Sequence, residues 1–205
     1  MFFKTSLAAQ LEQWNNTIKQ EPNNPRYYVQ RGMIYFKLGK IEESIADFDM
    51  AENLDFSITP YLWQRGLSYY YVDRFADGAK QFEIDLTVNS QDVEETVWRY
   101  LCIARLSGME EARNSLLPVK NDPRKIMVAI YDLFAGMCTV DDVLNVGKLP
   151  GLKGKFYSHL YVGLYYEAQG NLQLAQDYII KAADDYKIDD YMWYLSVVHK
   201  NLRNN

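Results

Sequence analysis

The chain has 205 residues, of which 48% are hydrophobic and 15% aromatic, and this composition indicates an ordered globular protein. The net charge of −5, from 22 Lys+Arg and 27 Asp+Glu, opposes general attraction to a phosphate backbone, so we expect no nucleic-acid partner. The sequence has no apolar run of the ~18 residues that a membrane span needs. Its first residues, MFFKTSLAAQLEQW, lack the apolar stretch of a secretory signal. We therefore expect no membrane association and a cytoplasmic location.

Residues 1–24 are predicted to form a helix that covers the start of the fold. Leu7, Leu11, Trp14 and Ile18 recur at helical spacing. The sequence EPNNP follows and ends the helix. The remaining side chains are largely polar, as the outer face of a terminal capping helix should be.

An arginine–glycine pair recurs further along the chain at an interval of 34 residues. Arg31 and Gly32 are followed by Arg65 and Gly66, and the same interval leads on to Arg99. Other positions keep this interval: Tyr28 and Leu62, Tyr35 and Tyr69, Phe48 and Phe82. A period of this length is typical of a solenoid of helix-turn-helix units.

These positions resemble the tetratricopeptide repeat family. The first copy, residues 25–58, has the following residues at the signature positions: Tyr28, Gly32, Tyr35, Gly39, Phe48 and Ala51. The second copy, residues 59–92, has a shorter set: Leu62, Gly66, Tyr69 and Phe82. A late copy, residues 156–189, restores the pattern: Gly163, Tyr166, Gly170, Ala175 and Ala182. The resemblance implies an all-α fold, a right-handed superhelix of antiparallel helix pairs.

The other segments are predicted to complete one domain over residues 1–205. Residues 93–121 form a third, weaker repeat, residues 122–153 an irregular repeat with a connector, and residues 190–205 a C-terminal helix. In that helix we expect four residues to point inward: Met192, Leu195, Val198 and Leu202. The succession from 93 to 182 is also similar to the C-terminal half of the NlpI-type bacterial lipoprotein adaptors, and to small tetratricopeptide proteins of plants and algae without assigned activity.

The irregular segment offers two helix starts and one loop. Asp122 can cap a helix that has Pro123 at its first position. Thr139 with Asp142 has the spacing of a second N-terminal cap. The glycine-rich GKLPGLKGK, residues 147–155, is predicted to be a mobile connector, because it lacks the spacing of a phosphate-binding loop.

The recurring glycines and arginines have separate explanations. Gly32 and Gly66 leave no side chain where two antiparallel helices cross, so the helices can approach closely. The arginines are either solvated or joined in ion pairs between neighbouring repeats. In the second case, the interval predicts that Asp49 pairs with Arg65, and that Glu83 or Asp85 pairs with Arg99.

The sequence shows no catalytic, metal-binding or cofactor-binding motif. The two histidines, His159 and His199, are too scattered for a recognisable metal site. The two cysteines do not have the spacing of a zinc or redox pair. His159 takes the place that Tyr28 has in the first repeat and is predicted to be a packed side chain. An enzyme that uses His159 beside Tyr157 and Glu167 is the least favoured of three hypotheses.

The resemblance implies that the first helix of each repeat lines a concave groove. The candidate peptide-binding residues are Val29, Met33, Phe36, Trp63, Leu67, Tyr70, Trp98 and Leu101. This apolar and aromatic lining favours an amphipathic or apolar segment of a protein partner, with tryptophan and tyrosine as rigid anchors. The favoured function is therefore a non-catalytic interaction scaffold.

A structural module is the alternative. The C-terminal helices can fold back over the groove and turn its aromatic side chains into core. An exposed aromatic surface can also join a second copy, so a homo-oligomer is left open.

Overall fold

The computed structural model describes residues 6–149 and 151–203, and within these residues the secondary structure consists of helices joined by loops, without a strand. The first half contains α1 (Leu7–Gln20), α2 (Pro25–Lys37), α3 (Ile41–Leu54), the 3₁₀ helix η1 (Phe56–Tyr61), α4 (Trp63–Tyr71), α5 (Phe75–Asp85) and α6 (Val93–Ser107). The second half contains α7 (Met109–Asn114), α8 (Lys125–Ala135), α9 (Val140–Lys148), α10 (Leu152–Ala168), α11 (Leu172–Asp184) and α12 (Tyr191–Arg203).

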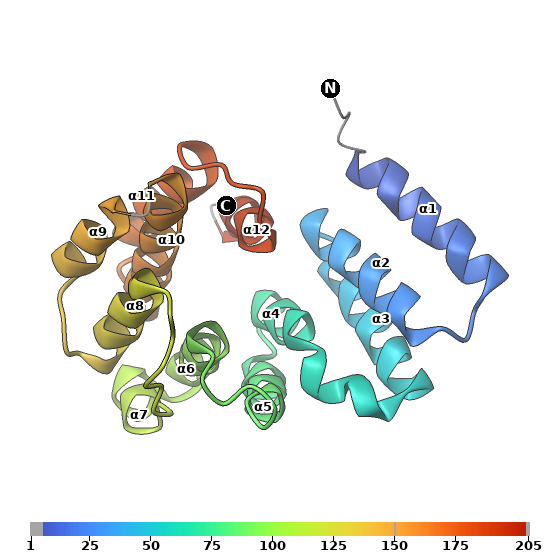
Figure 1. Ribbon diagram of the computed structural model, residues 1–205, viewed down its shortest axis with the longest axis horizontal. Coiled ribbons are helices and arrows are strands. Elements are labelled where there is room, and N and C mark those ends of the chain that lie inside the picture. The colour runs from blue at the N-terminus through green and yellow to red at the C-terminus, as the bar shows by residue number, and fades with distance from the viewer. Residues whose placement is uncertain (1–5, 150, 204–205) are drawn as a thin grey trace.

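The helices follow an arc from α1 to α11, and α12 lies inside this arc (Figure 1). Successive helices pack against one another as antiparallel pairs, most extensively α2 with α3 and α10 with α11. The expected all-α solenoid of helix pairs is confirmed. In addition, α12 contacts α2, which brings the two ends of the arc together through its interior.

Glycines close the turns within the best-formed pairs. Gly39, between α2 and α3, has φ +72°, and Gly170, between α10 and α11, has φ +76°. Only glycine adopts this left-handed conformation without a steric cost, so both helices end at the expected positions. α2 begins with Pro25 in its first turn, and the Asn24 side chain accepts a hydrogen bond from Arg26 N.

The glycines inside the helices allow close helix crossings, as predicted. A Cβ on Gly66 would lie 2.7 Å from Phe82 Cζ, and one on Gly32 would lie 3.2 Å from Phe48 Cζ. The late repeat uses the same device, because a Cβ on Gly163 would lie 2.8 Å from Ile179 Cγ1. Ordinary carbon contacts are ~3.5–4.0 Å, so any larger residue would push these pairs apart.

Arg65 joins three helices in the middle of the regular repeats. Its side chain is nearly buried and donates to Asp49 Oδ1 at 3.0 Å and to Glu52 Oε2 at 2.7 Å, both on the preceding α3. It also donates to Gln81 Oε1 at 2.8 Å on its own partner helix, α5. The predicted ion pair between Asp49 and Arg65 is therefore confirmed.

The same geometry repeats at Arg31 and Arg99. Each of the three arginines contacts one residue 16 positions earlier and one 16 positions later. These contacts are Asn15 and Asp47 for Arg31, Asp49 and Gln81 for Arg65, and Glu83 (3.7 Å) and the Ser115 carbonyl for Arg99. We call this series the arginine ladder. The predicted pair of Glu83 with Arg99 is confirmed, whereas Asp85 accepts a hydrogen bond from Gln81 instead.

The irregular segment differs from its prediction at two places. α8 begins at Lys125 rather than directly after Asp122, because the Asp122 carboxylate accepts from both Arg124 N and the Arg124 guanidinium and so holds a non-helical turn. α10 begins at Leu152, so most of the expected connector over 147–155 is helical. Two of the glycines there, Gly147 and Gly154, are buried, and a Cβ on Gly147 would clash with Ser158.

Thr139 caps α9 as predicted, in a reciprocal capping box with Asp142. In α12, Met192, Leu195 and Val198 are buried as expected. Leu202 is 41% exposed, so its predicted inward position is wrong; on this last turn it is the neighbouring Arg203 that faces α4, where it donates to the Tyr70 carbonyl.

Candidate functional site

α12 occupies the concave side of the arc. The Tyr191 ring lies 5.5 Å from the Phe36 ring and 5.4 Å from the Trp63 ring. Further along the helix, His199 Nδ1 is 3.2 Å from the Tyr71 hydroxyl, and Arg203 donates to the Tyr70 carbonyl at 3.1 Å. The interior of the arc is therefore filled, over much of its length, by a helix of the same chain.

Most of the predicted groove residues are consequently core residues. Five of them are 2% exposed or less: Phe36, Leu67, Tyr70, Trp98 and Leu101. The other three, Val29, Met33 and Trp63, are half-buried and can be reached from outside. Peptide binding by the groove stays a prediction, and in this structure only these three residues can take part in it directly.

The structural repeat positions lie where the repeats pack. Gly32, Gly66 and Gly163 are buried at helix crossings. The signature tyrosines accompany them at the ends of the first helices: Tyr35, Tyr69 and Tyr166. Tyr69 is buried beneath Arg74, whose guanidinium carbon lies 4.3 Å from the ring centroid, and Tyr166 stacks on Tyr178.

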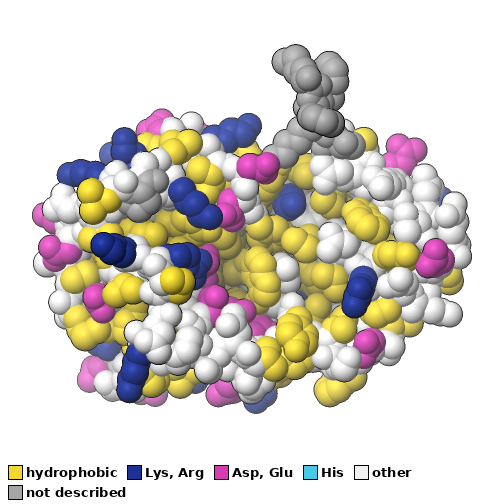
Figure 2. All heavy atoms as spheres, viewed as in Figure 1, with side chains coloured by type: hydrophobic (Ala, Val, Ile, Leu, Met, Phe, Trp, Pro, Cys, Tyr) yellow, Lys and Arg dark blue, Asp and Glu magenta, His cyan; other side chains and the backbone are white. Residues whose placement is uncertain are grey.

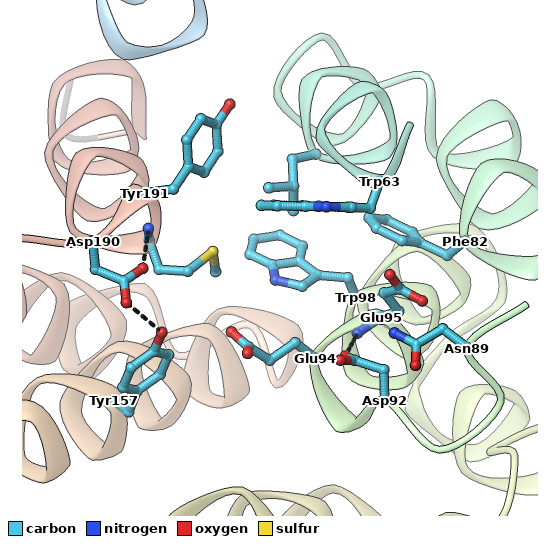
Figure 3. A pocket seen from close by; sticks show the side chains of 12 residues that line it. Trp63, Phe82, Asn89, Asp92, Glu94, Glu95, Trp98, Tyr157, Asp190 and Tyr191 are labelled. Carbon is cyan, nitrogen blue, oxygen red and sulfur yellow. Dashed lines mark hydrogen bonds between the residues drawn. The ribbon is translucent and has the colours of Figure 1, made fainter. Parts of the chain in front are cut away.

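A cavity of about 330 Å³ remains where the N-terminus of α12 faces α4 and α6. We call it the aromatic–acidic pocket and define it by Trp63, Trp98, Tyr191, Asp92 and Glu95. Figure 3 shows the two tryptophans on one side of the pocket and Tyr191 on the other. In the space-filling view, hydrophobic side chains gather in a hollow between the two arms of the arc, with acidic side chains beside it (Figure 2).

Two carboxylates at the pocket are paired with cations. Glu94 binds Arg124 Nη1 at 2.6 Å and accepts a hydrogen bond from the Tyr161 hydroxyl. Asp190 lies 3.7 Å from Lys153 Nζ. These two groups bring no uncompensated charge to the pocket.

Asp92 and Glu95 have no such partner among the ion pairs of the described residues. Asp92 caps α6 by accepting a hydrogen bond from Glu95 N at 2.9 Å. Burial, followed by the nearby charges of Asp92 and Asp85, raises the pKa of Glu95 to about 8. Glu95 is therefore largely protonated near neutral pH, and a nearby cation would favour its ionised form.

A second polar cluster holds the C-terminal end of α12. The Tyr70 hydroxyl donates to Glu167 Oε2 at 2.9 Å, and Arg105 Nη1 lies 3.3 Å from Glu167 Oε1. Arg203 pairs with Asp73 at 2.8 Å. The charges of this cluster balance one another, and its contacts join α4, α6, α10 and α12. We call the cluster the structural lock.

The candidate catalytic residues are not brought together. His159 packs against Tyr178 and Tyr186, as expected for a packed side chain. Tyr157 donates to Asp190, whereas Glu167 belongs to the lock at the other end of α12. Within the described part of the chain, no cluster of His, Cys, Asp and Glu could hold a metal ion.

Sequence reasoning identified Trp63 and Trp98 but missed Glu95 and Tyr191. The pair Glu94–Glu95 lies in the first turn of α6, where acidic residues are common for helix stability alone. Tyr191 joins the pocket only through the docking of α12. Among the helices described, none is long and apolar enough to cross a membrane.

Residues 25–57, which comprise α2 and α3, match the family model for the tetratricopeptide repeat. This match covers the repeat with the most complete set of signature residues, and the packing of the other helix pairs follows the same plan. Repeats of this kind generally mediate contacts between proteins. The resemblance drawn from the sequence is thus confirmed for residues 25–57, which form a tetratricopeptide repeat.

Proposed function

We propose that this protein is a non-catalytic interaction scaffold that binds an amphipathic segment of another protein at the mouth of the concave hollow, while α12 stays in place. The observation that supports this most is the position of Val29, Met33 and Trp63. These half-buried apolar side chains lie on the first helices of two successive repeats. Trp63 also lines the aromatic–acidic pocket.

The energetics of α12 favour binding beside this helix rather than in its place. Met192, Leu195 and Val198 are at most 5% exposed. Exposing such side chains costs about 1.5–3 kcal/mol each, before the hydrogen bonds of His199 and Arg203 are broken. A segment that binds at the mouth avoids this cost. It can use Trp63 as an anchor, since tryptophans at the centre of an interface often dominate the binding energy.

Site-specific photo-crosslinking tests the proposal. A photoreactive phenylalanine analogue at position 63 should form cross-links to a partner in a native lysate. The same analogue at position 56 is the control, because Phe56 is 78% exposed but does not line the pocket. Cross-links that map to one defined segment of a partner, from position 63 alone, are the expected result. Equal labelling from both positions would contradict the proposal.

A structural or self-associating module is the second candidate, and the burial of five predicted groove residues favours it. In this case, the aromatic side chains serve the core, and the exposed apolar residues serve contacts between copies. Leu149 and Leu172, at 82% and 68% exposed, are candidates for such contacts. Light scattering at micromolar concentration separates the two functions, because a monomer argues against self-association.

A further inference from the structure

The aromatic–acidic pocket contains buried polar atoms without partners. In the described residues, six buried side-chain polar atoms lack a hydrogen bond, and three of them line this pocket: Glu95 Oε2, Trp98 Nε1 and the Tyr191 hydroxyl. Trp98 as a whole is 2% exposed. Buried polar groups in native proteins nearly always have a partner, so their concentration in one cavity points to a ligand.

The chemistry of the walls indicates the charge of this ligand. The indole rings of Trp63 and Trp98 and the Tyr191 ring carry negative potential on their faces, which attracts cations. The carboxyl groups of Asp92 and Glu95, which have no cationic partner among the described residues, also favour a cation. The pocket therefore suits an organic cation better than an anion or a neutral group.

The surrounding charges are consistent with this preference. The groups that act on Glu95 are Asp92, Asp85 and Glu94, all acidic, and the Asn89 amide. Three cations lie beside residues of the pocket: Arg124 and Lys153 are bound to Glu94 and Asp190, and Lys37 Nζ lies 5.3 Å from the centroid of the Tyr191 ring. No cation of the described residues pairs with Glu95.

We propose that the pocket binds one basic side chain, an arginine or a lysine, of the partner segment, with Glu95 as its counter-charge and the Trp63, Trp98 and Tyr191 rings as its walls. This inference rests on the proposed function. The cavity of about 330 Å³ is near the lower end of the range for small-ligand sites, so it suits a single side chain. The Tyr191 hydroxyl can accept from the cation. The Trp98 N–H, near the Tyr161 hydroxyl, is a donor for the adjacent main-chain carbonyl.

Binding of a cation is expected to release a proton. Glu95, with its pKa raised to about 8, holds a proton in the free protein near neutral pH, and the cation favours its ionised form. Affinity should therefore increase between about pH 6 and about pH 9. Calorimetry in buffers with different ionisation enthalpies detects the released proton directly.

Nuclear magnetic resonance of the tryptophan indole N–H groups tests the site. The probes are N-acetyl-arginine amide and N-acetyl-lysine amide, with N-acetyl-citrulline amide as the neutral analogue of arginine. The two basic probes should shift the Trp63 and Trp98 signals and leave those of Trp14 and Trp193 unchanged. Equal shifts with the citrulline probe, or no shift with either basic probe, would overturn the proposal.

Two variants identify the residues that hold the cation. Glu95→Gln preserves the shape of the side chain and should weaken binding of the arginine probe by about tenfold above pH ~8, while Tyr191→Phe should weaken it about threefold. Glu110→Gln, an exposed acid on α7, is the matched control and should have no effect. Unchanged affinity of the Glu95→Gln variant, with its melting temperature preserved, contradicts the assignment.

These measurements are independent of the photo-crosslinking test. If position 63 cross-links to a partner but the basic probes do not bind, the scaffold function stands and the pocket proposal fails. If the probes bind but no partner is cross-linked, the pocket binds cations and the scaffold function fails.

Discussion

Residues 25–107 and residues 125–203 are both built from helix pairs, but different contacts join one pair to the next. In the first region, the arginine ladder connects each pair to its neighbours through Arg31, Arg65 and Arg99. In the second region, a contact between aromatic rings joins successive pairs instead: Phe134 of α8 packs edge-on against Tyr165 of α10. Both regions have a glycine where the two helices of a pair cross: Gly32 and Gly66 in the first region and Gly163 in the second.

The comparison separates two structural tasks. The glycines determine how closely the two helices of one pair approach, whichever region they belong to. The ladder determines the distance between pairs, and it is needed only where the 34-residue period continues. Where the period ends, after α6, apolar contacts allow the chain to deviate from the regular stack and to return α12 to the interior.

The largest expected effect comes from breaking the ladder at its centre. Arg65→Met should lower the free energy of unfolding by about 3 kcal/mol, because it leaves Glu52, with a side chain 24% exposed, without its counter-charge. Arg99→Met should cost only about 1 kcal/mol, since its partner Glu83 is 51% exposed. Urea unfolding measures both. Similar losses for the two variants would show that the ladder is uniform rather than centred on Arg65.

The next effect concerns pH and the buried Asp85 of the first region. Burial raises the pKa of Asp85 from 3.8 to about 7, although Gln81 donates to it and Arg65 is nearby. The folded state therefore holds a proton that the unfolded state loses, and stability falls as pH rises from about 4 through 7. Asp85→Asn should remove this loss, which the rise of the pKa from 3.8 to about 7 limits to about 4 kcal/mol. Urea unfolding of the wild type and the variant across this pH range measures the difference. If the stabilities of the two proteins changed with pH in parallel, the prediction would be contradicted.

The crossing glycines of the two regions can be compared directly. Alanine gains about 1 kcal/mol of helix propensity over glycine, but overpacking costs about 1–3 kcal/mol. At Gly66 the new Cβ would lie 2.7 Å from the Phe82 ring, at Gly163 2.8 Å from the movable Ile179 side chain, and at Gly32 3.2 Å from Phe48. Thermal unfolding should therefore show a net loss of stability of about 1.5 kcal/mol for Gly66→Ala, about 1 kcal/mol for Gly163→Ala and about 0 kcal/mol for Gly32→Ala. A loss at Gly32 as large as that at Gly66 would show that the contact distances do not control the effect.

The smallest effect concerns His199 in α12. Burial lowers the pKa of His199 below its ordinary value of 6.5. The charges of Arg203 and Arg105 lower this pKa further, whereas the charge of Glu167 raises it. The unfolded state therefore takes up the proton more readily, and stability is lost as pH falls below about 6.5. His199→Gln, which keeps an acceptor for Tyr71, should reduce this acid-side loss. His159→Gln is the comparison: burial also lowers the pKa of the half-buried His159, so its reduction should be smaller, and an equal reduction in both variants would exclude a specific role for α12.

Much of the first region could be predicted from the sequence because its contacts recur at a fixed interval. The pairs of Asp49 with Arg65 and of Glu83 with Arg99 follow from that interval alone. Asn15 was missed, although it lies one 34-residue interval before Asp49 and so takes the same position in the capping helix. The capping helix therefore acts as the second helix of a preceding repeat.

The second region and the pocket could not be predicted to the same extent. Nothing local indicates that Tyr191 meets Phe36 and Trp63, because the contact depends on the path of every helix between them. The groups around Glu95, by contrast, are close to it in the chain: Asp85, Asn89, Asp92 and Glu94. Local turn chemistry was also misleading at Asp122, where the Arg124 guanidinium competes for the carboxylate that was expected to cap a helix.

The docking of α12 has a consequence for synthesis on the ribosome. The contact of Tyr71 with His199 spans 128 residues, so at about 5–20 residues per second the later partner is made roughly 6–25 s after the earlier one. During that delay the nascent repeats present Phe36, Tyr70 and Tyr71 without the side chains of α12 that pack on them. A chain that ends before α12 would therefore expose apolar side chains. Molecular chaperones would bind it through side chains that are buried in the complete protein.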